Sequence, residues 1–363
     1  MKNIVRANIL NVKPYVPGKP IEEVERELGL KDVIKLASNE SCLGPSPKAV
    51  AAIKRSLKSI NRYPDSSSFY LKKKVAKLLG VGEDNVIFGN GSDEVICLAI
   101  KTFVNPGDEV IIARPTFLIY EIASQLHNAE IKLVGLTKDF KYDLKSMRAA
   151  ITEKTKIIFI ANPDNPTGTY VTKNELDEFF KGLPENIIVF LDEAYYEFAN
   201  SAARDYPNGL DYLKRPGVIV ARSFSKAYGL AGLRIGYGVS SATVINYMER
   251  AREPFNVNLL AQVGALAALD DKKFLKRELK HVAREKKFLY SAFREMKISY
   301  VPSATNFILV DVRRDCKEVF NKLLKEGVIV RDMKAWGLDS YIRLTIGTRR
   351  ENIKFIKSLG KII

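Results

Sequence analysis

The feature that most constrains the fold is the alternation, from Val86 onward, of short apolar runs with longer amphipathic stretches. Short runs bounded by turn residues predict strands, and this order is typical of an α/β sheet whose strands are mostly parallel. Several runs are almost wholly apolar, as expected for strands that are covered on both faces. We predict seven strands, at Val86–Gly89, Glu109–Ala113, Ile131–Val134, Lys156–Ala161, Ile187–Asp192, Val218–Arg222 and Leu233–Gly238.

The pattern changes after about Asn258. Two helical stretches, Leu259–Leu269 and Lys272–Met296, lead into three apolar runs, which predicts a smaller α+β domain. We place its strands at Asn306–Val310, Val328–Val330 and Tyr341–Thr345. The chain is therefore expected to divide into an arm that packs with the smaller domain (1–45), a large ligand-binding domain (46–257) and the smaller domain (258–363).

The composition limits the kinds of partner. With 46% hydrophobic and 28% charged residues, the chain resembles a soluble globular protein, and no run is long enough to span a bilayer. The first ten residues lack the order of a secretory signal, so we expect a cytoplasmic location and no membrane partner. Three scattered cysteines indicate neither disulfides nor a metal site. The net charge of +16 is better explained by a solvated basic surface than by a nucleic-acid patch, because the lysines lie mostly on amphipathic helical stretches such as Lys272–Lys287.

The run VIVARSFSKAYG (Val218–Gly229) is the first candidate site, because polar side chains follow a buried strand. Ligands in open α/β sheets bind at the carboxyl ends of the strands. Lys226 stands between small hydroxyl residues there, with Arg234 a little further on. A lysine that is desolvated near another cation has a depressed pKa and becomes a usable nucleophile. Taken alone, however, Lys226 is better read as one of many surface lysines.

An acid ends another predicted strand, in IIVFLDEAY (Ile187–Tyr195). A buried carboxylate needs a cationic partner, and a protonated pyridine nitrogen is one such partner for Asp192. Tyr195 follows three positions later, so its hydroxyl can reach the same ligand. The alternative for Asp192 is a helix N-cap, and the two interpretations are evenly matched from the residues alone.

Three more strand ends carry weaker signals. In ANPDNPTG (161–168) two prolines force a rigid turn and Asn165 presents an amide, although an ordinary tight turn explains the prolines. In FGNGSDE (88–94) a glycine-spotted turn opens a helix, which makes an anion site. Phe117 could offer a flat face to an aromatic cofactor, although core packing is the simpler interpretation.

Together these signals suit one planar, phosphorylated, nitrogen-containing aldehyde. The segments FGNGSDE, NPDNPTG, LDEAYYEF and SFSKAYGLAGLRIGYG resemble the motifs of the fold-type I aminotransferases that depend on pyridoxal phosphate. The resemblance is strongest to the histidinol-phosphate aminotransferase branch and runs nearly end to end, from YVPGKPIEEV (15–24) through NRYPD to PSATNFILV and YIRLTIGT. It implies a large domain that binds the cofactor on a mostly parallel seven-stranded sheet.

The resemblance also implies a role for each residue. Lys226 forms the Schiff base with the cofactor and moves protons, Asp192 pairs with the pyridine nitrogen, and Tyr195 completes the catalytic set. The other residues implied to bind the cofactor are Asn165 at its ring oxygen, Ser92, Asp93, Ser223, Ser225 and Arg234 at its phosphate, Phe117 on its ring, and Tyr63, which reaches the partner's site in a homodimer. The residues implied to bind substrate are Tyr15, Asn39, Arg331 and Arg343.

The expected reaction transfers an amino group from histidinol phosphate to a 2-oxo acid, 2-oxoglutarate, in histidine biosynthesis. Within the same cofactor class, an aromatic or broad-specificity aminotransferase and a threonine-phosphate decarboxylase remain open. Arg343 cannot separate them, because a guanidinium binds a carboxylate and a phosphate equally well. A DNA-binding regulator is disfavoured, since only about forty residues precede Pro45 and they resemble the aminotransferase arm.

Overall fold

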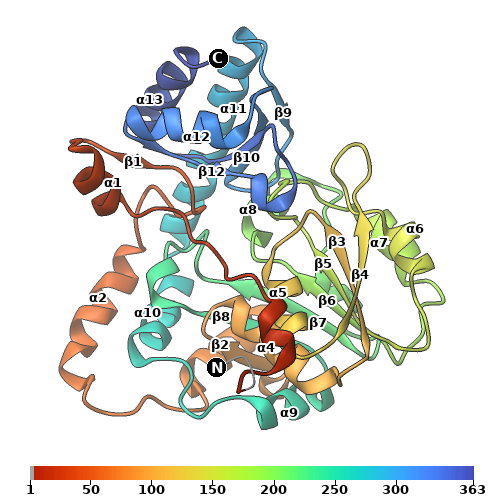
Figure 1. The fold of residues 1–363 in the computed structure, drawn as a ribbon. Coiled ribbons are helices and arrows are strands. Elements are labelled where there is room, and N and C mark those ends of the chain that lie inside the picture. Colours follow the sequence, from red (N-terminus) through yellow and green to blue (C-terminus); the bar gives the residue numbers. More distant parts are fainter. Residues whose placement is uncertain (1–3) are drawn as a thin grey trace.

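The computed structural model describes residues 4–363 and has a larger α/β part below a smaller α+β part (Figure 1). Its main sheet confirms the predicted fold class, with seven strands in the order β2-β8-β7-β6-β5-β3-β4. All neighbours are parallel except β8, which is antiparallel to both β2 and β7. The strands are β2 (Val86–Gly89), β3 (Glu109–Arg114), β4 (Glu130–Gly135), β5 (Thr155–Ala161), β6 (Ile188–Asp192), β7 (Val218–Ser223) and β8 (Gly236–Val239).

One strand boundary differs clearly from the prediction. β8 begins at Gly236 rather than at Leu233, because Ala231–Leu233 form a turn of 3-10 helix. Arg234 then adopts a left-handed conformation with φ of 55°, which a strand cannot contain. The apolar character of this run did not reveal the turn, although the turn is what directs Arg234 toward the sheet edge.

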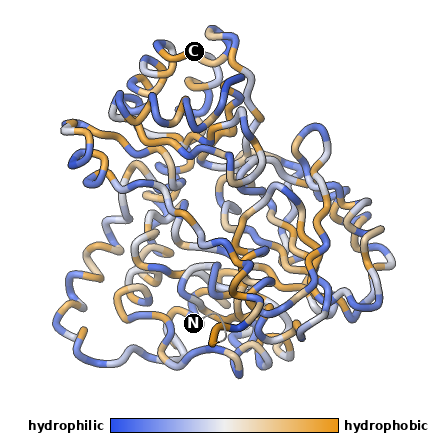
Figure 2. Tube along the Cα trace, viewed as in Figure 1, coloured by the Kyte–Doolittle hydropathy of each residue, from blue (hydrophilic) through white to orange (hydrophobic). Residues whose placement is uncertain are grey.

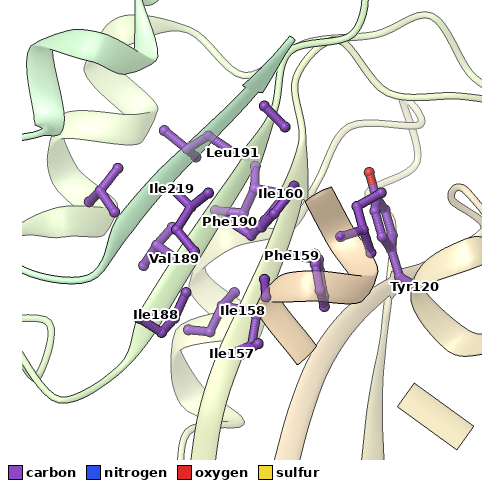
Figure 3. Packing of buried hydrophobic residues seen from close by; sticks show 14 of the residues in the cluster. Tyr120, Ile157, Ile158, Phe159, Ile160, Ile188, Val189, Phe190, Leu191 and Ile219 are labelled. Atoms are coloured by element: carbon purple, nitrogen blue, oxygen red, sulfur yellow. The ribbon is translucent and has the colours of Figure 1, made fainter. Parts of the chain in front are cut away.

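The centre of the larger part is an apolar core on both faces of this sheet. Figure 2 shows hydrophobic stretches along its strands, and Figure 3 shows side chains of β5 and β6 packed with Ile219 and Tyr120. Phe159 and Phe190 have no exposed surface, and burying such a side chain contributes roughly 1.5–3 kcal/mol. The helices that contribute to this core are α4 (Ser92–Phe103), α5 (Ile119–Leu126), α6 (Leu144–Ala149), α7 (Lys173–Phe180) and α9 (Ala242–Ala251).

The smaller part is a four-stranded antiparallel sheet in the order β12-β13-β10-β9 with three helices. The sequence predicted β10 (Phe307–Asp311) and β13 (Tyr341–Thr345), but it missed β9 (Ser299–Val301) and β12 (Arg331–Asp332). The helices are α11 (Lys272–Glu295), α12 (Cys316–Lys325) and α13 (Arg349–Gly360). A short helix from the larger part, α8 (Tyr196–Ala202), packs against α11.

The helix α10 (Leu259–Leu269) lies on the other side of the boundary that the sequence suggested. It packs against α2 (Pro47–Ser56) and α3 (Phe69–Leu79), beside the larger sheet (Figure 1). Its buried positions are small, and a side chain at Gly264 would come within 3.2 Å of Ile53. This close contact between helices needs small residues, and the run of Ala and Leu alone could not show which part of the chain they face.

The N-terminal arm is attached at two places. Asn8 donates through Nδ2 to the carbonyl of Gln125, 2.9 Å away, so the 3-10 turn Ala7–Asn11 rests on α5. Further along, α1 (Ile21–Leu28) and β1 (Ile34–Lys35) lie beside the smaller part, where β1 pairs in parallel with β11 (Val328–Ile329). The arm therefore bridges both parts of the molecule. Across the described chain, every helix is too short or too polar to cross a bilayer.

Candidate active site

A cavity of about 310 Å³ opens at the carboxyl edge of the parallel strands, between the larger sheet and the smaller part. It collects residues from both parts and from the arm. Of the fifteen predicted site residues, fourteen line it: Tyr15, Asn39, Ser92, Asp93, Phe117, Asn165, Asp192, Tyr195, Ser223, Ser225, Lys226, Arg234, Arg331 and Arg343. Segments more than three hundred residues apart in sequence thus meet at one site.

Asp192 is the last residue of β6 and is 5% exposed. Its Oδ2 accepts a 2.7 Å hydrogen bond from the hydroxyl of Tyr120, and its Oδ1 accepts one from the backbone N–H of Ala194. Burial raises the pKa of Asp192 to about 6, and the hydrogen bond from Tyr120 opposes that rise. No cation of residues 4–363 pairs with this carboxylate, so it is available to a cationic ligand.

Lys226 lies in the loop that follows β7 and points into the same cavity. Its Nζ donates to the carbonyl of Ser38 in the arm, 3.2 Å away. Desolvation, aided by the nearby Arg343, lowers the pKa of Lys226 to about 8. A substantial fraction of this amine is therefore neutral near physiological pH, as a nucleophile or a base requires.

One end of the cavity is built to hold an anion. The helix α4 begins there at Ser92, directly after Gly91, whose φ of 79° is in the left-handed region. A Cβ on Gly91 would come within 2.6 Å of the guanidinium of Arg234, so only glycine leaves room for that arginine. The buried hydroxyl of Ser225 has no hydrogen-bond partner in the described chain. Backbone N–H groups, hydroxyls and a guanidinium together form a phosphate-type site.

Arg234 has an acidic neighbour at this end. Its Nη2 lies 3.1 Å from Oδ2 of Asp93, and both side chains are partly exposed. An exposed ion pair of this kind contributes little to stability, but it fixes where the guanidinium points. Ser223, which ends β7, accepts from the backbone N–H of Ser225 at 3.0 Å. The two predicted serines are thus held in one turn.

The other end of the cavity contains two arginines from the smaller part. Arg343 of β13 donates to the Asn165 side-chain oxygen and to the Ala37 carbonyl, the latter at 2.8 Å. Arg331 of β12 donates to the carbonyl of Val16 at 2.6 Å. Both are less than a tenth exposed, and each has an Nε without a partner in the described chain.

Neither arginine has an acid within ion-pair distance among residues 4–363. Two buried, unpaired positive charges are costly unless an anion joins them. Aromatic rings flank Arg331, with the centroids of Trp336 and Tyr15 at 5.2 and 5.8 Å from its guanidinium carbon. This end of the cavity therefore suits a substrate with an acidic group.

Tyr63 is the one predicted site residue that does not line the cavity. It is 83% exposed, and its ring stacks on Phe255 with centroids 4.7 Å apart. Conversely, the cavity includes Tyr120, Ser38 and Trp336, which the sequence did not single out. Tyr120 lies one helical turn beyond Phe117, so the spacing within RPTFLIY was the available signal.

These groups fit pyridoxal phosphate. An orphaned hydroxyl beside Arg234 and a helix start suits the phosphate, and an uncompensated carboxylate at Asp192 suits the ring nitrogen. Phe117 lines the cavity where a ring would stack, and it meets Tyr120 edge to face at 5.7 Å. Fold and site together fit one enzyme class, the aminotransferases that use this cofactor.

Comparison with known proteins leads to the same class. The family described as aminotransferase class I and II matches residues 31–359. Two curated relatives named histidinol-phosphate aminotransferase come from Moorella thermoacetica and Carboxydothermus hydrogenoformans. The first is 51% identical and covers 99% of this chain and 92% of the relative; the second is 48% identical and covers 99% of both. The chain belongs to the class I and II aminotransferases and, within them, to the family of these relatives.

A solved structure shows the same fold. The histidinol-phosphate aminotransferase of Sinorhizobium meliloti, in complex with pyridoxal 5'-phosphate, superposes with a TM-score of 0.90 at 28% identity. The match covers 99% of this chain and 98% of that one. The predicted family, fold class and cofactor are therefore confirmed.

Proposed function

We propose that the protein transfers the amino group of histidinol phosphate to 2-oxoglutarate, yielding imidazole acetol phosphate and glutamate. The observation that carries this proposal is the pair of buried, unpaired arginines, Arg331 and Arg343, in the cavity that contains Lys226 and Asp192. Both substrates have an acidic end, a phosphate in one and a carboxylate in the other. The name shared by the curated relatives supports histidinol phosphate as the donor.

The site residues divide the chemical work among them. Pyridoxal phosphate, when bound, supplies an aldehyde that condenses with an amine and a ring that accepts electrons as a Cα–H bond breaks. Asp192 keeps the proton on the ring nitrogen, because its buried carboxylate gains a cationic partner only in that state. Tyr120 and the Ala194 N–H hold the carboxylate in place for this role.

Lys226 is the proposed general base. Its amine would take the proton from the substrate Cα and hold it for its return, which a group with a pKa near the working pH does well. The nearby positive charge of Arg343 and the dehydrated surroundings both favour the neutral amine. The carbonyl of Ser38 accepts from Nζ and orients it within the cavity.

The arginines account for the alternation between two substrates. A guanidinium makes bidentate contacts with a phosphate or a carboxylate, so one site can serve both half-reactions. The carbonyl of Ala37 and the amide oxygen of Asn165 hold the Arg343 fork in position. Because Asn165 offers its oxygen to Arg343, its amide nitrogen is left to donate to the cofactor's ring oxygen, together with Tyr195.

We also propose a homodimer in which Tyr63 reaches the phosphate of the partner's cofactor. Its high exposure, its position outside its own cavity and its place beside the exposed Ile60 and Phe255 support this role, since a contiguous exposed apolar patch marks an interaction surface. We propose the three-part division of the chain as well, with α10 moved to the larger domain because of its contacts with α2. A cytoplasmic location stays a prediction.

Steady-state rates with 2-oxoglutarate as acceptor test the donor. We expect kcat/KM for histidinol phosphate to exceed that for phenylalanine by at least about 100-fold, since a doubly charged phosphate can compensate both buried arginines and the single carboxylate of phenylalanine only one. A preference for phenylalanine would instead establish an aromatic aminotransferase. Release of carbon dioxide from threonine phosphate would establish the decarboxylase.

A further inference from the structure

Thr345 ends β13 behind the cavity and is 3% exposed. It does not line the cavity, but its hydroxyl makes two contacts with Asn39, which does. The backbone N–H of Asn39 donates to Oγ1 of Thr345 at 2.9 Å, and Oγ1 in turn lies 3.2 Å from Oδ1 of Asn39. The amide nitrogen of Asn39 is 2.8 Å from the hydroxyl oxygen of Tyr195.

One assignment of donors and acceptors satisfies all three of these hydrogen bonds. A backbone N–H can only donate, so Oγ1 of Thr345 accepts there and keeps its single hydrogen for Oδ1 of Asn39. With its oxygen engaged, the amide of Asn39 must turn its NH₂ toward Tyr195 and donate to it. Tyr195 therefore accepts from Asn39, and its own hydrogen remains free for another partner.

The opposite orientation of Asn39 would have a different result. Its oxygen would then face Tyr195 and accept the tyrosine hydrogen, while the threonine hydrogen would lose its acceptor in a buried place. A buried hydrogen that loses its acceptor keeps the full cost of desolvation, which disfavours the flipped amide. The hydroxyl of Thr345 is thus what distinguishes the two orientations.

We propose that Thr345 is a positioning residue that makes Tyr195 a hydrogen-bond donor to the ring oxygen of the cofactor, acting through the side chain of Asn39. The inference rests on the role of Tyr195 in the proposed function and extends it to a residue outside the cavity. A second amide fixes the same segment, because Nδ2 of Asn306 donates to the carbonyl of Asn39 at 3.0 Å. Asn39 itself is 1% exposed with a left-handed φ of 55°.

The surroundings of Tyr195 suit this role. Burial raises its pKa to about 12, so the hydroxyl keeps its hydrogen at working pH. The charged groups that face it are Arg343 from β13, Asp192 from β6 and Lys226, whose Nζ is 5.9 Å from the ring centroid. A hydrogen donated to the ring oxygen stabilises its anionic form. Losing that donation makes the oxygen hold a proton more tightly, so the cofactor titrates at higher pH.

The test is a pH titration of the absorbance of the bound cofactor. Thr345→Val keeps the shape of the side chain and removes the hydroxyl, so we expect the midpoint to rise and kcat/KM to fall by about 3–10-fold. Thr345→Ser keeps the hydroxyl and should restore the wild-type midpoint. In a Tyr195→Phe background, Thr345→Val should move the midpoint no further, because the hydrogen that it controls is gone.

A matched control is Thr155→Val, which removes a buried threonine hydroxyl at the far end of β5 and should leave the midpoint unchanged. If Thr345→Val does not fold, Thr345→Ala is expected to give the same shift with less crowding. An unchanged midpoint, or a shift that adds to that of Tyr195→Phe, overturns the inference. The titration needs no substrate, so its result does not depend on which amino donor the enzyme uses. A wrong amino donor would change only the steady-state rates, whereas a wrong role for Thr345 would appear in the titration midpoint.

Discussion

Tyr120→Phe tests how the carboxylate of Asp192 is kept ready for the cofactor. The change removes one buried hydroxyl, whose 2.7 Å hydrogen bond to Asp192 favours the ionised form. The ring would keep its place, because it stacks on Phe159 with centroids 4.7 Å apart and meets Phe117 edge to face. The perturbation is therefore electrostatic and leaves the packing intact.

The expected change in the pKa of Asp192 follows from the charge on this hydrogen-bond acceptor. A hydrogen bond to a charged group contributes about 1.5–3 kcal/mol, and one pKa unit corresponds to about 1.4 kcal/mol. Losing the Tyr120 hydroxyl should therefore raise the pKa of Asp192 by about 1–2 units above its value of about 6. Because we propose that the ionised carboxylate holds the ring nitrogen, cofactor binding should weaken as pH falls through this higher pKa.

The assay is the Kd of the apoenzyme for pyridoxal phosphate between pH 5.5 and 8.5. Free pyridoxal phosphate changes its own protonation over this pH range, but this affects the Kd of every variant equally and cancels when the variants are compared. Tyr212→Phe is the control, since it removes a tyrosine that donates to another carboxylate, Asp177, at 2.6 Å outside the cavity. If the Kd profile of Tyr120→Phe coincides with those of the wild type and the control, Tyr120 does not stabilise the ionised Asp192.

Four further changes test other parts of the site. Lys226→Ala should abolish the imine absorbance band of the bound cofactor and lower kcat by about 10²–10⁴-fold, measured in single turnovers. Gly91→Ala, which crowds Arg234, should weaken cofactor binding in a fluorescence titration, whereas Gly107→Ala, at another left-handed glycine with open space around it and outside the cavity, should not. Arg343→Lys should raise KM for both substrates by about 10-fold through loss of bidentate contacts; an effect on one substrate alone would contradict a shared site. Folding raises the pKa of Asp192 from 3.8 to about 6, so the wild-type apoenzyme loses stability as pH rises through that window. In urea unfolding across this pH range, the unfolding free energy of Asp192→Asn should fall by up to about 3 kcal/mol less than that of the wild type.

The sequence predicted the elements whose pattern is local. Strands such as β2 and β13 are runs of apolar residues between turn signals, and both match their predicted bounds. The short strands β1, β9 and β12 have two or three residues, too few to establish a period, and they exist because of partners far along the chain. The packing of α10 against α2 was invisible for the same reason.

The same distinction between local patterns and long-range contacts applies to the candidate site. Lys226, Asp192 and Asn165 stand at strand ends, and parallel strands bring their ends to one edge, so sequence order already implied proximity. Tyr120 was missed because a tyrosine in an apolar helix looks like any core residue until its hydroxyl is seen against Asp192. The contact of Asn165 with Arg343 joins residues 178 positions apart, which no spacing rule anticipates.

The attachment of the arm to the smaller sheet has a consequence for how such enzymes diversify. β1 pairs with β11, and the carbonyl of Leu36 accepts from the backbone N–H of Thr345, so the residues that we propose to bind the substrate belong to one structural unit. Lys226 and Asp192, which we propose to carry out the chemistry, belong to another. A chimera that exchanges the arm together with the smaller sheet should therefore acquire a new amino donor and keep the same catalytic steps. Selection for a new substrate can act on one unit of the molecule while the other stays unchanged.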